Sequence, residues 1–179
     1  MDYNCDSEEN YYDGDDVDDW MLTFKPYKNT ISEILPGKLY LSDYVAAADI
    51  SMLQERNITR VISLGGMQDH TMYTVHNNNN NVRTISYHFV YIDDRETEPI
   101  HEHFRECIDF IRTGKEDEAV LIHCYAGKSR SATIVIAYLM DQGMNYLQAY
   151  DFVEKRRNCI DPNEGFRNRL MDFQYSRYK

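Results

Sequence analysis

The stretch "HCYAGKSRSAT", from His123 to Thr133, contains one cysteine and, six residues later, one arginine, with a glycine and hydroxyl side chains around them. The apolar run "AVLIH" (Ala119–His123) leads into this stretch at His123, and the apolar run "IVIAYLM" (Ile134–Met140) follows it. A short continuous apolar run is typical of a strand buried on both faces, and the longer one is typical of a helix. This part of the sequence therefore predicts a strand, a tight loop and a helix.

A loop of this kind is typical of an anion site. Its backbone N–H groups point inward, and the positive end of the helix dipole lies behind them. This field favours the thiolate form of a cysteine such as Cys124. Arg130 carries a planar guanidinium, which holds two oxygens of a phosphate at once. Gly127 lets the backbone turn close to the ligand.

Two further side chains of the stretch fit this interpretation. Ser131 offers its hydroxyl to the sulfur, and His123 fixes the loop through side-chain hydrogen bonds. A lone cysteine after a strand is more often a small buried apolar residue. However, Cys124 is the only one of the four cysteines with an arginine six places later. The pattern therefore favours a nucleophile and its phosphate-binding arginine.

The rest of the chain alternates between strand and helix patterns. Strands are predicted at 38–42, 60–66 and 84–92, and helices at 46–58, 100–111, 129–142 and 166–173. Asn145 and Gln148 resemble a capping box at the start of one more helix. The alternation predicts an α/β fold, in which a central, mostly parallel (mixed) sheet is flanked by helices on both faces in three layers.

The net charge of −11 is unevenly distributed. Residues 1–20 contain nine acidic side chains and no Lys or Arg, which leaves 21 acids and 19 bases in the rest. We predict an acidic disordered tail over 1–25 and one catalytic domain over 29–176. The tail is interpreted either as a solvating segment or as a regulatory one that contacts a basic pocket. A nearly neutral body does not indicate a nucleic-acid partner.

The sequence also suggests where the protein resides. It has no apolar run near the ~20 residues that span a bilayer, so we expect no stable membrane insertion. Its four cysteines are scattered without a CxxC pair, which favours reduced thiols over disulfides or a zinc site. The N-terminus does not look like a signal peptide. A cytoplasmic location is expected, and a nuclear one is the alternative.

The stretch around Cys124 fits the HCxxGxxRS signature and resembles the small (atypical) dual-specificity phosphatases, within the cysteine-dependent protein tyrosine phosphatase superfamily. The segments "AYLM" (Ala137–Met140) and "PNEGFRNRL" (Pro162–Leu170) resemble further parts of these proteins. So does the segment 39–65, in which a strand and an alanine-rich stretch precede an apolar strand that closes on glycine. The resemblance covers about residues 29–175.

This resemblance implies hydrolysis of phosphotyrosine and phosphoserine/threonine on a phosphorylated protein substrate, through a cysteinyl-phosphate intermediate and without a metal or other cofactor. It implies that Cys124 attacks phosphorus and that Ser131 helps the thiolate leave. His123 and Asn163 are expected to support the loop. The phosphate oxygens are expected to contact the loop and its arginine: Tyr125, Ala126, Gly127, Lys128, Ser129 and Arg130.

The family also uses an aspartate on a separate loop, about thirty residues before the cysteine, as general acid. The segment "VYIDDRETEPIHEHF" offers two candidates, Asp93 and Asp94. The spacing to Phe104 on the following helix matches the family pattern best for Asp94, so Asp94 is the favoured acid. The same aspartate would then activate water in the second step.

Other functions remain open at this stage. Lys128 places a positive charge in the loop, as in phosphoinositide-directed relatives, so phosphoinositide or another non-protein phosphate monoester is the alternative substrate. A phosphate-binding module without turnover is the alternative from another class. The segment "EKRR" (Glu154–Arg157) is interpreted as a helix end whose positive charges interact favourably with the helix dipole, and the alternative is that Arg156 or Arg157 binds a second phosphate or a docking motif. His101 and His103 form an HxH pair, but positions i and i+2 do not face each other on a helix, so no metal site is predicted there.

Overall fold

The computed structural model describes residues 30–65, 74–76, 82–115 and 117–176. The predicted acidic tail lies outside these ranges. The described part contains a five-stranded sheet with the order β1-β2-β7-β3-β6 and a separate two-stranded sheet of β4 and β5. The strands are β1 (Ser32–Leu35), β2 (Leu39–Ser42), β3 (Ile58–Leu64), β4 (Thr74–His76), β5 (Val82–Thr84), β6 (Ser86–Val90) and β7 (Ala119–His123).

The main sheet is mixed, as predicted. The strand β1 pairs antiparallel with β2, whereas β2, β7, β3 and β6 are parallel to one another. The central strand β7 is formed by the "AVLIH" run, whose first four residues are buried. A strand covered on both faces needs this continuous apolar character, because neither side of it meets water.

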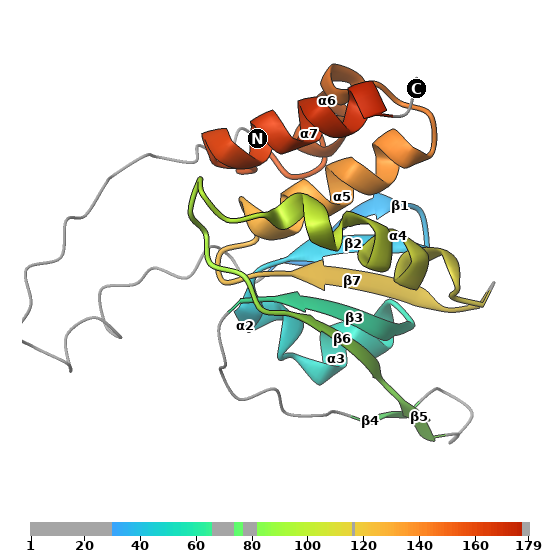
Figure 1. Cartoon of the computed structure of the whole chain (residues 1–179). Helices are drawn as coiled ribbons and strands as arrows, with labels where there is room; N and C mark the ends of the chain where they lie inside the picture. Colours follow the sequence, from blue (N-terminus) through green and yellow to red (C-terminus); the bar gives the residue numbers. More distant parts are fainter. Residues whose placement is uncertain (1–29, 66–73, 77–81, 116, 177–179) are drawn as a thin grey trace, which may run out of the picture.

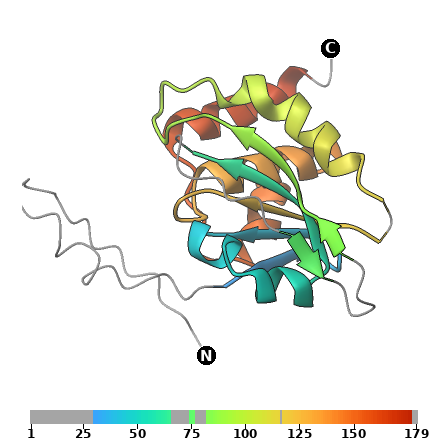
Figure 2. The same cartoon turned by 90° about the horizontal axis from the view of Figure 1, so that it is seen from below.

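Helices cover both faces of the sheet (Figures 1 and 2). One face packs against the short helices α2 (Tyr44–Ala47) and α3 (Ile50–Glu55), which share a cluster of buried residues with the sheet. The other face packs against a larger cluster contributed by η1 and the long helices. These are η1 (Ile100–His103), α4 (Phe104–Arg112), α5 (Arg130–Asp141), α6 (Tyr146–Glu154) and α7 (Glu164–Ser176). The three-layer prediction is confirmed.

Helix α5 lies at the centre of the larger layer. Nine of its residues are buried, from Ser131 to Met140, because α4, α6 and α7 surround it. Gly143, just beyond its end, has φ 113°, a conformation that favours glycine. The predicted capping box of Asn145 and Gln148 is present at the start of α6. The burial of α5 fixes the position of the loop that precedes it.

Two predicted elements are wrong in their extent. The single helix expected over 46–58 is two helices, because the Asp49 side chain accepts hydrogen bonds from the backbone N–H groups of Ser51 and Met52 and so starts a new helix. The strand expected over 84–92 is interrupted at Ile85 and ends at Val90. The edge strand β1 was not predicted. Among the described residues, no helix is both long and apolar enough to cross a bilayer.

Candidate active site

The candidate site lies where the parallel strands β2, β7 and β3 end. In this register His123, the last residue of β7, is level with Ser42 of β2 and Ser63 of β3. Cys124 follows at once, and the loop 125–129 leads into α5. Ligands of open α/β sheets bind at this edge, because the loops that follow the strands converge there.

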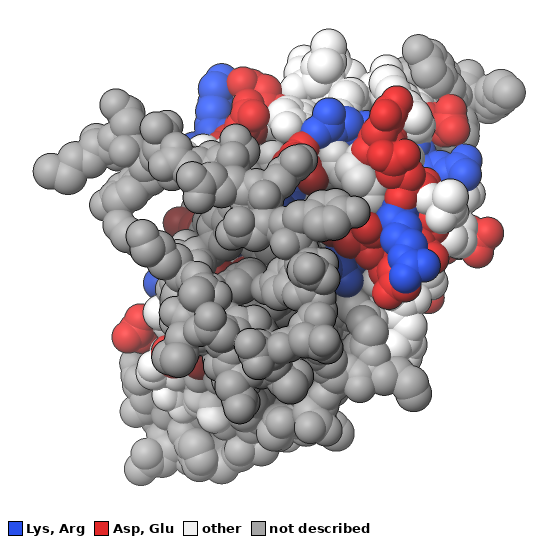
Figure 3. All heavy atoms as spheres, turned by 90° about the vertical axis from the view of Figure 1, so that its left-hand side faces the viewer, with Lys and Arg blue, Asp and Glu red and all other residues white. Residues whose placement is uncertain are grey.

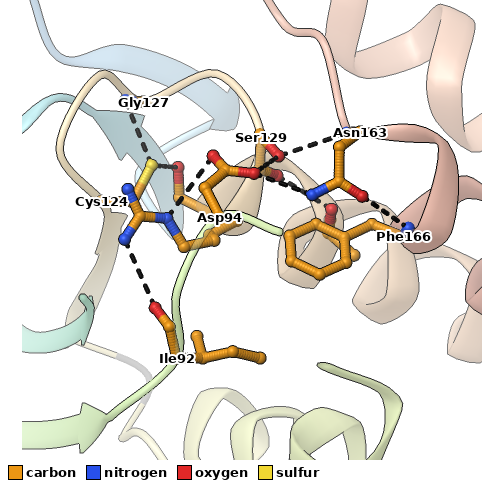
Figure 4. A network of polar contacts seen from close by, with 10 residues as sticks. Ile92, Asp94, Cys124, Gly127, Ser129, Asn163 and Phe166 are labelled. Atoms are coloured by element: carbon orange, nitrogen blue, oxygen red, sulfur yellow. Dashed lines mark hydrogen bonds and ion pairs between the residues drawn. The ribbon is translucent and has the colours of Figure 1, made fainter. Parts of the chain in front are cut away.

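The cysteine thiol is enclosed by its own loop (Figure 4). Cys124 is only 2% exposed. Its Sγ lies 3.1 Å from the Ser131 hydroxyl and accepts a hydrogen bond from the Gly127 backbone N–H at 3.3 Å. The predicted contact between the serine and the sulfur is therefore present. The Gly127 N–H stabilises negative charge on the sulfur, and the Ser131 hydroxyl does the same when it is the donor of its hydrogen bond.

Gly127 is required by the shape of the loop. Its φ is +66°, and a Cβ built on it would lie 2.5 Å from the Ser42 carbonyl oxygen and 2.6 Å from an Arg157 guanidinium nitrogen. Both distances are shorter than any ordinary carbon contact. Only glycine allows the loop to pass this close to β2 while its N–H faces the sulfur.

Arg157 holds the phosphate loop in place through hydrogen bonds to its main chain. Its side chain is 4% exposed, and its guanidinium donates to the carbonyl oxygens of Gly127 (2.8 Å), Ala126 (3.4 Å) and Thr30 (3.3 Å). The Asp43 carboxylate lies 3.9 Å away and neutralises its charge. The hypothesis that Arg157 binds a second phosphate is therefore wrong, since its side chain is buried and its donors are taken up by these carbonyl oxygens and the Ser32 hydroxyl. It is a positioning residue for the phosphate loop.

Replacing Arg157 with methionine is expected to lower the free energy of unfolding by about 3–5 kcal/mol, because the change leaves a buried carboxylate and several carbonyls without their partner. Urea denaturation measures this free energy of unfolding. The matched control is Arg156→Met. Arg156 is exposed, stacks on the Phe152 ring at 3.5 Å and donates to the Phe152 carbonyl oxygen. Its loss is expected to cost less than about 1 kcal/mol. Equal costs for the two variants would contradict the role of Arg157.

The two candidate acids occupy different environments. Asp94 Oδ1 accepts hydrogen bonds from the Ser129 hydroxyl at 2.6 Å and from the Asn163 side-chain amide at 2.9 Å (Figure 4). Its Oδ2 lies 3.5 Å from Arg130 Nε. Asp93 is exposed, and its ion pair is with Arg95 at 3.6 Å. The structure thus brings Asp94, and not Asp93, together with the loop that carries Cys124.

Asn163 connects the acid to the rest of the fold. Its side-chain oxygen accepts from the Phe166 backbone N–H at 2.9 Å, in the first turn of α7, while its amide group donates to Asp94. Its own backbone N–H donates to the Ser129 hydroxyl at 3.3 Å. The start of α7 also touches the acid segment directly, since a Cβ on Gly165 would lie 1.9 Å from the Glu96 carbonyl oxygen. The proposed support role of Asn163 has a clear geometric basis.

Two other loop residues, Lys128 and Tyr125, contact neighbouring segments of the fold. The Lys128 carbonyl accepts from the Asp161 N–H at 2.9 Å. The Tyr125 ring stacks on Tyr44 with centroids 5.0 Å apart, and both rings are more than one-third exposed. Sequence reasoning did not identify Tyr44 or the contact between Ser129 and Asp94, because neither is encoded in a local pattern.

A cysteine that follows the central strand, a glycine turn, and an arginine next to a separate aspartate define the class of cysteine-based phosphatases. A family model, the dual specificity phosphatase catalytic domain, matches residues 39–176. The chain belongs to the dual specificity phosphatase family. It is 33% identical to dual specificity protein phosphatase 1 of Arabidopsis thaliana, over 83% of this chain and 71% of that protein. It is also 33% identical to dual specificity protein phosphatase 15 of Mus musculus, over 83% of this chain and 59% of the other.

Solved structures support the fold. A crystal structure of DUSP15 matches with a TM-score of 0.73 and 31% identity, covering 84% of this chain and 91% of that one. The human tyrosine phosphatase-like serine/threonine/tyrosine-interacting protein matches with a TM-score of 0.72 and 33% identity, over 83% and 98%. A probable rhodanese domain-containing dual specificity protein phosphatase from Dictyostelium discoideum is 37% identical over 80% of this chain. The match covers only 29% of that longer relative.

Proposed function

We propose that the chain hydrolyses phosphotyrosine and phosphoserine/threonine on proteins. One observation carries this proposal: Cys124, Ser131, Arg130 and Asp94 converge at the end of β7, although Asp94 comes from a segment thirty residues away. Family membership favours the same reaction. A purely structural cysteine would need neither the N–H and O–H donors at its sulfur nor a carboxylate held across the loop.

In the first step, the Cys124 thiolate attacks phosphorus and the bond to the leaving oxygen breaks. The backbone N–H groups of the loop that are not bonded to the sulfur, with the Arg130 guanidinium, bind the phosphate oxygens and stabilise their charge. Asp94, protonated, donates its proton to the leaving oxygen. Arg130 already lies beside Asp94, so both groups reach the same phosphate.

In the second step, a water molecule attacks the cysteinyl-phosphate and the sulfur–phosphorus bond breaks. Asp94, now ionised, accepts the proton of this water. Ser131 donates its hydroxyl hydrogen to the sulfur, from 3.1 Å, and so stabilises the departing thiolate. Inorganic phosphate then leaves the loop.

Two exposed aromatic rings at the phosphate loop, those of Tyr44 and Tyr125, favour a protein substrate over a lipid or RNA phosphate. Figure 3 shows the side of the molecule on the left of Figure 1, and in the small described part that is visible there, Lys and Arg side chains lie among Asp and Glu side chains. A lipid surface or a nucleic acid would be matched by a basic patch. The exposed Tyr44 and Tyr125 rings instead offer apolar contacts to a peptide side chain. A phosphoinositide substrate remains the second candidate, supported by Lys128 in the loop.

Turnover of peptides phosphorylated on tyrosine and on threonine tests the proposal, with inositol phosphates as comparison and EDTA present throughout. We expect release of phosphate from both peptides. Faster release from inositol phosphates than from either peptide would support the second candidate. A folded, reduced protein that binds phosphopeptide without releasing phosphate would instead indicate a binding module, the class suggested by the name of the human phosphatase-like neighbour.

Two further proposals rest mainly on the sequence. We propose a reducing location, the cytoplasm or the nucleus, since the mechanism requires a reduced thiol at Cys124 and no disulfide joins the described cysteines. We also propose that the acidic residues before position 20 modulate substrate access. Equal turnover of the full chain and a chain without residues 1–25 would refute this second proposal.

A further inference from the structure

A second cluster of chemically reactive side chains lies outside the candidate active site. It consists of His88 on β6 with Glu106 and Cys107 on α4, and one potential ligand atom from each lies within 4.8 Å of the other two. The strand β6 and helix α4 flank the segment 91–99, which carries Asp94. The cluster therefore joins the two elements that enclose the acid segment.

His88 supplies the main observation. Its Nε2 is buried and has no hydrogen-bond partner, and Glu106 Oε1 lies 3.7 Å from it. Buried polar atoms are normally satisfied, and 3.7 Å is too long for a hydrogen bond. By contrast, two N or O ligands of one tetrahedral zinc ion lie about 3.4 Å apart. The His88 ring is also held in place, because it stacks on Phe110 with centroids 5.4 Å apart.

Glu106 is oriented by a second histidine. His103 Nδ1 lies 2.6 Å from Glu106 Oε1, one helical turn away. Hydrogen bonds of this kind fix the ligands of metal sites and tune their charge. His101 is exposed and is not part of the cluster. Of the HxH pair, His103 reaches the cluster through its contact with Glu106.

Cys107 is the third residue of the cluster and offers a sulfur ligand. It is fully buried, and this burial, with a smaller contribution from Glu106, raises the pKa of its thiol to about 12. The phosphatase mechanism makes no use of this thiol. Binding of a metal ion releases the proton of a cysteine ligand, so a high pKa weakens the site without removing it.

We propose that His88, Glu106 and Cys107 bind a divalent ion of the zinc class, with water as the fourth ligand. One nitrogen, one oxygen and one sulfur donor suit Zn²⁺ and Co²⁺ and disfavour Mg²⁺ or Ca²⁺, which prefer oxygen alone. The bound ion connects β6 to α4 and is separate from the phosphate chemistry, which requires no metal.

The test uses the full chain with Cys124→Ser, so that the nucleophile does not bind the metal. Zn²⁺ is titrated by calorimetry, and Co²⁺ is followed by its visible bands and its thiolate charge-transfer band. We expect His88→Gln to weaken Zn²⁺ binding at least about tenfold, as loss of a ligand exceeds loss of an outer-shell partner. Cys107→Ala should remove the charge-transfer band. His101→Gln, the matched control, should bind like the parent.

Two further measurements distinguish loss of metal binding from loss of folding. Thermal midpoints in EDTA verify that each variant is folded, and Glu106→Gln, at a half-exposed position, provides a second ligand change if His88→Gln is unstable. Equal Zn²⁺ affinity in the ligand variants and the parent would overturn the proposal. So would a charge-transfer band that survives Cys107→Ala. Either result would leave His88 and Glu106 as an ordinary ion pair.

Discussion

Replacing Cys124 with serine is expected to lower kcat for a small aryl phosphate by at least about 10⁴-fold, as for the removal of other enzymatic nucleophiles. A serine hydroxyl is a much weaker nucleophile than a cysteine sulfur, so it does not attack phosphorus at a useful rate. The exchange changes one buried atom, and Ser131 and the Gly127 N–H group remain as hydrogen-bond donors to the new oxygen. Binding of a phosphopeptide should therefore persist.

The measurement is kcat in EDTA together with the Kd of a phosphopeptide by calorimetry. The control is Cys159→Ser, which changes a partly buried thiol that the mechanism does not use and should leave kcat unchanged. A Cys124→Ser protein that retains more than a few per cent of the activity would contradict covalent catalysis by this residue. Loss of both turnover and binding would point to a damaged loop instead.

The sequence predicted the part of the site that is local in the chain. Cys124, Gly127, Arg130 and Ser131 lie within one strand, loop and helix, and each local preference agrees with the final structure: apolar strand, glycine at positive φ, helix start. The sheet and the helical layers were predictable for the same reason, since their apolar periodicity follows from burial.

Contacts between distant segments were not predictable in this way. The links from Arg157 to Gly127 and from Ser129 to Asp94 connect residues 30 and 35 positions apart. They exist because the loop after β7 packs against both the acid segment and the segment that follows α6, and no residue pattern along the chain encodes this. Local competition also misled the helix prediction, because the Asp49 side chain binds backbone N–H groups and starts a new helix.

Replacing Asp94 with asparagine is expected to lower kcat by about 10²–10³-fold, within the usual contribution of a general acid. The amide oxygen keeps the size of the carboxylate oxygen and still accepts from Ser129 and Asn163, so the site should remain assembled. What is lost is the transferable proton. KM should change little, because Asp94 acts mainly in the transition state.

The identity of the acid depends on comparison with Asp93→Asn. Asp93 is exposed and pairs with Arg95, so its replacement should leave kcat within about twofold, as expected for a weak surface ion pair.

A proton donor matters most when the leaving oxygen is a strong base. The Asp94→Asn defect should therefore be larger for alkyl phosphates, which resemble phosphoserine, than for aryl phosphates with acidic phenols. If Asp93→Asn shows this leaving-group dependence and Asp94→Asn does not, Asp93 is the acid, and the contacts of Asp94 with Ser129 and Arg130 serve only to hold the loop.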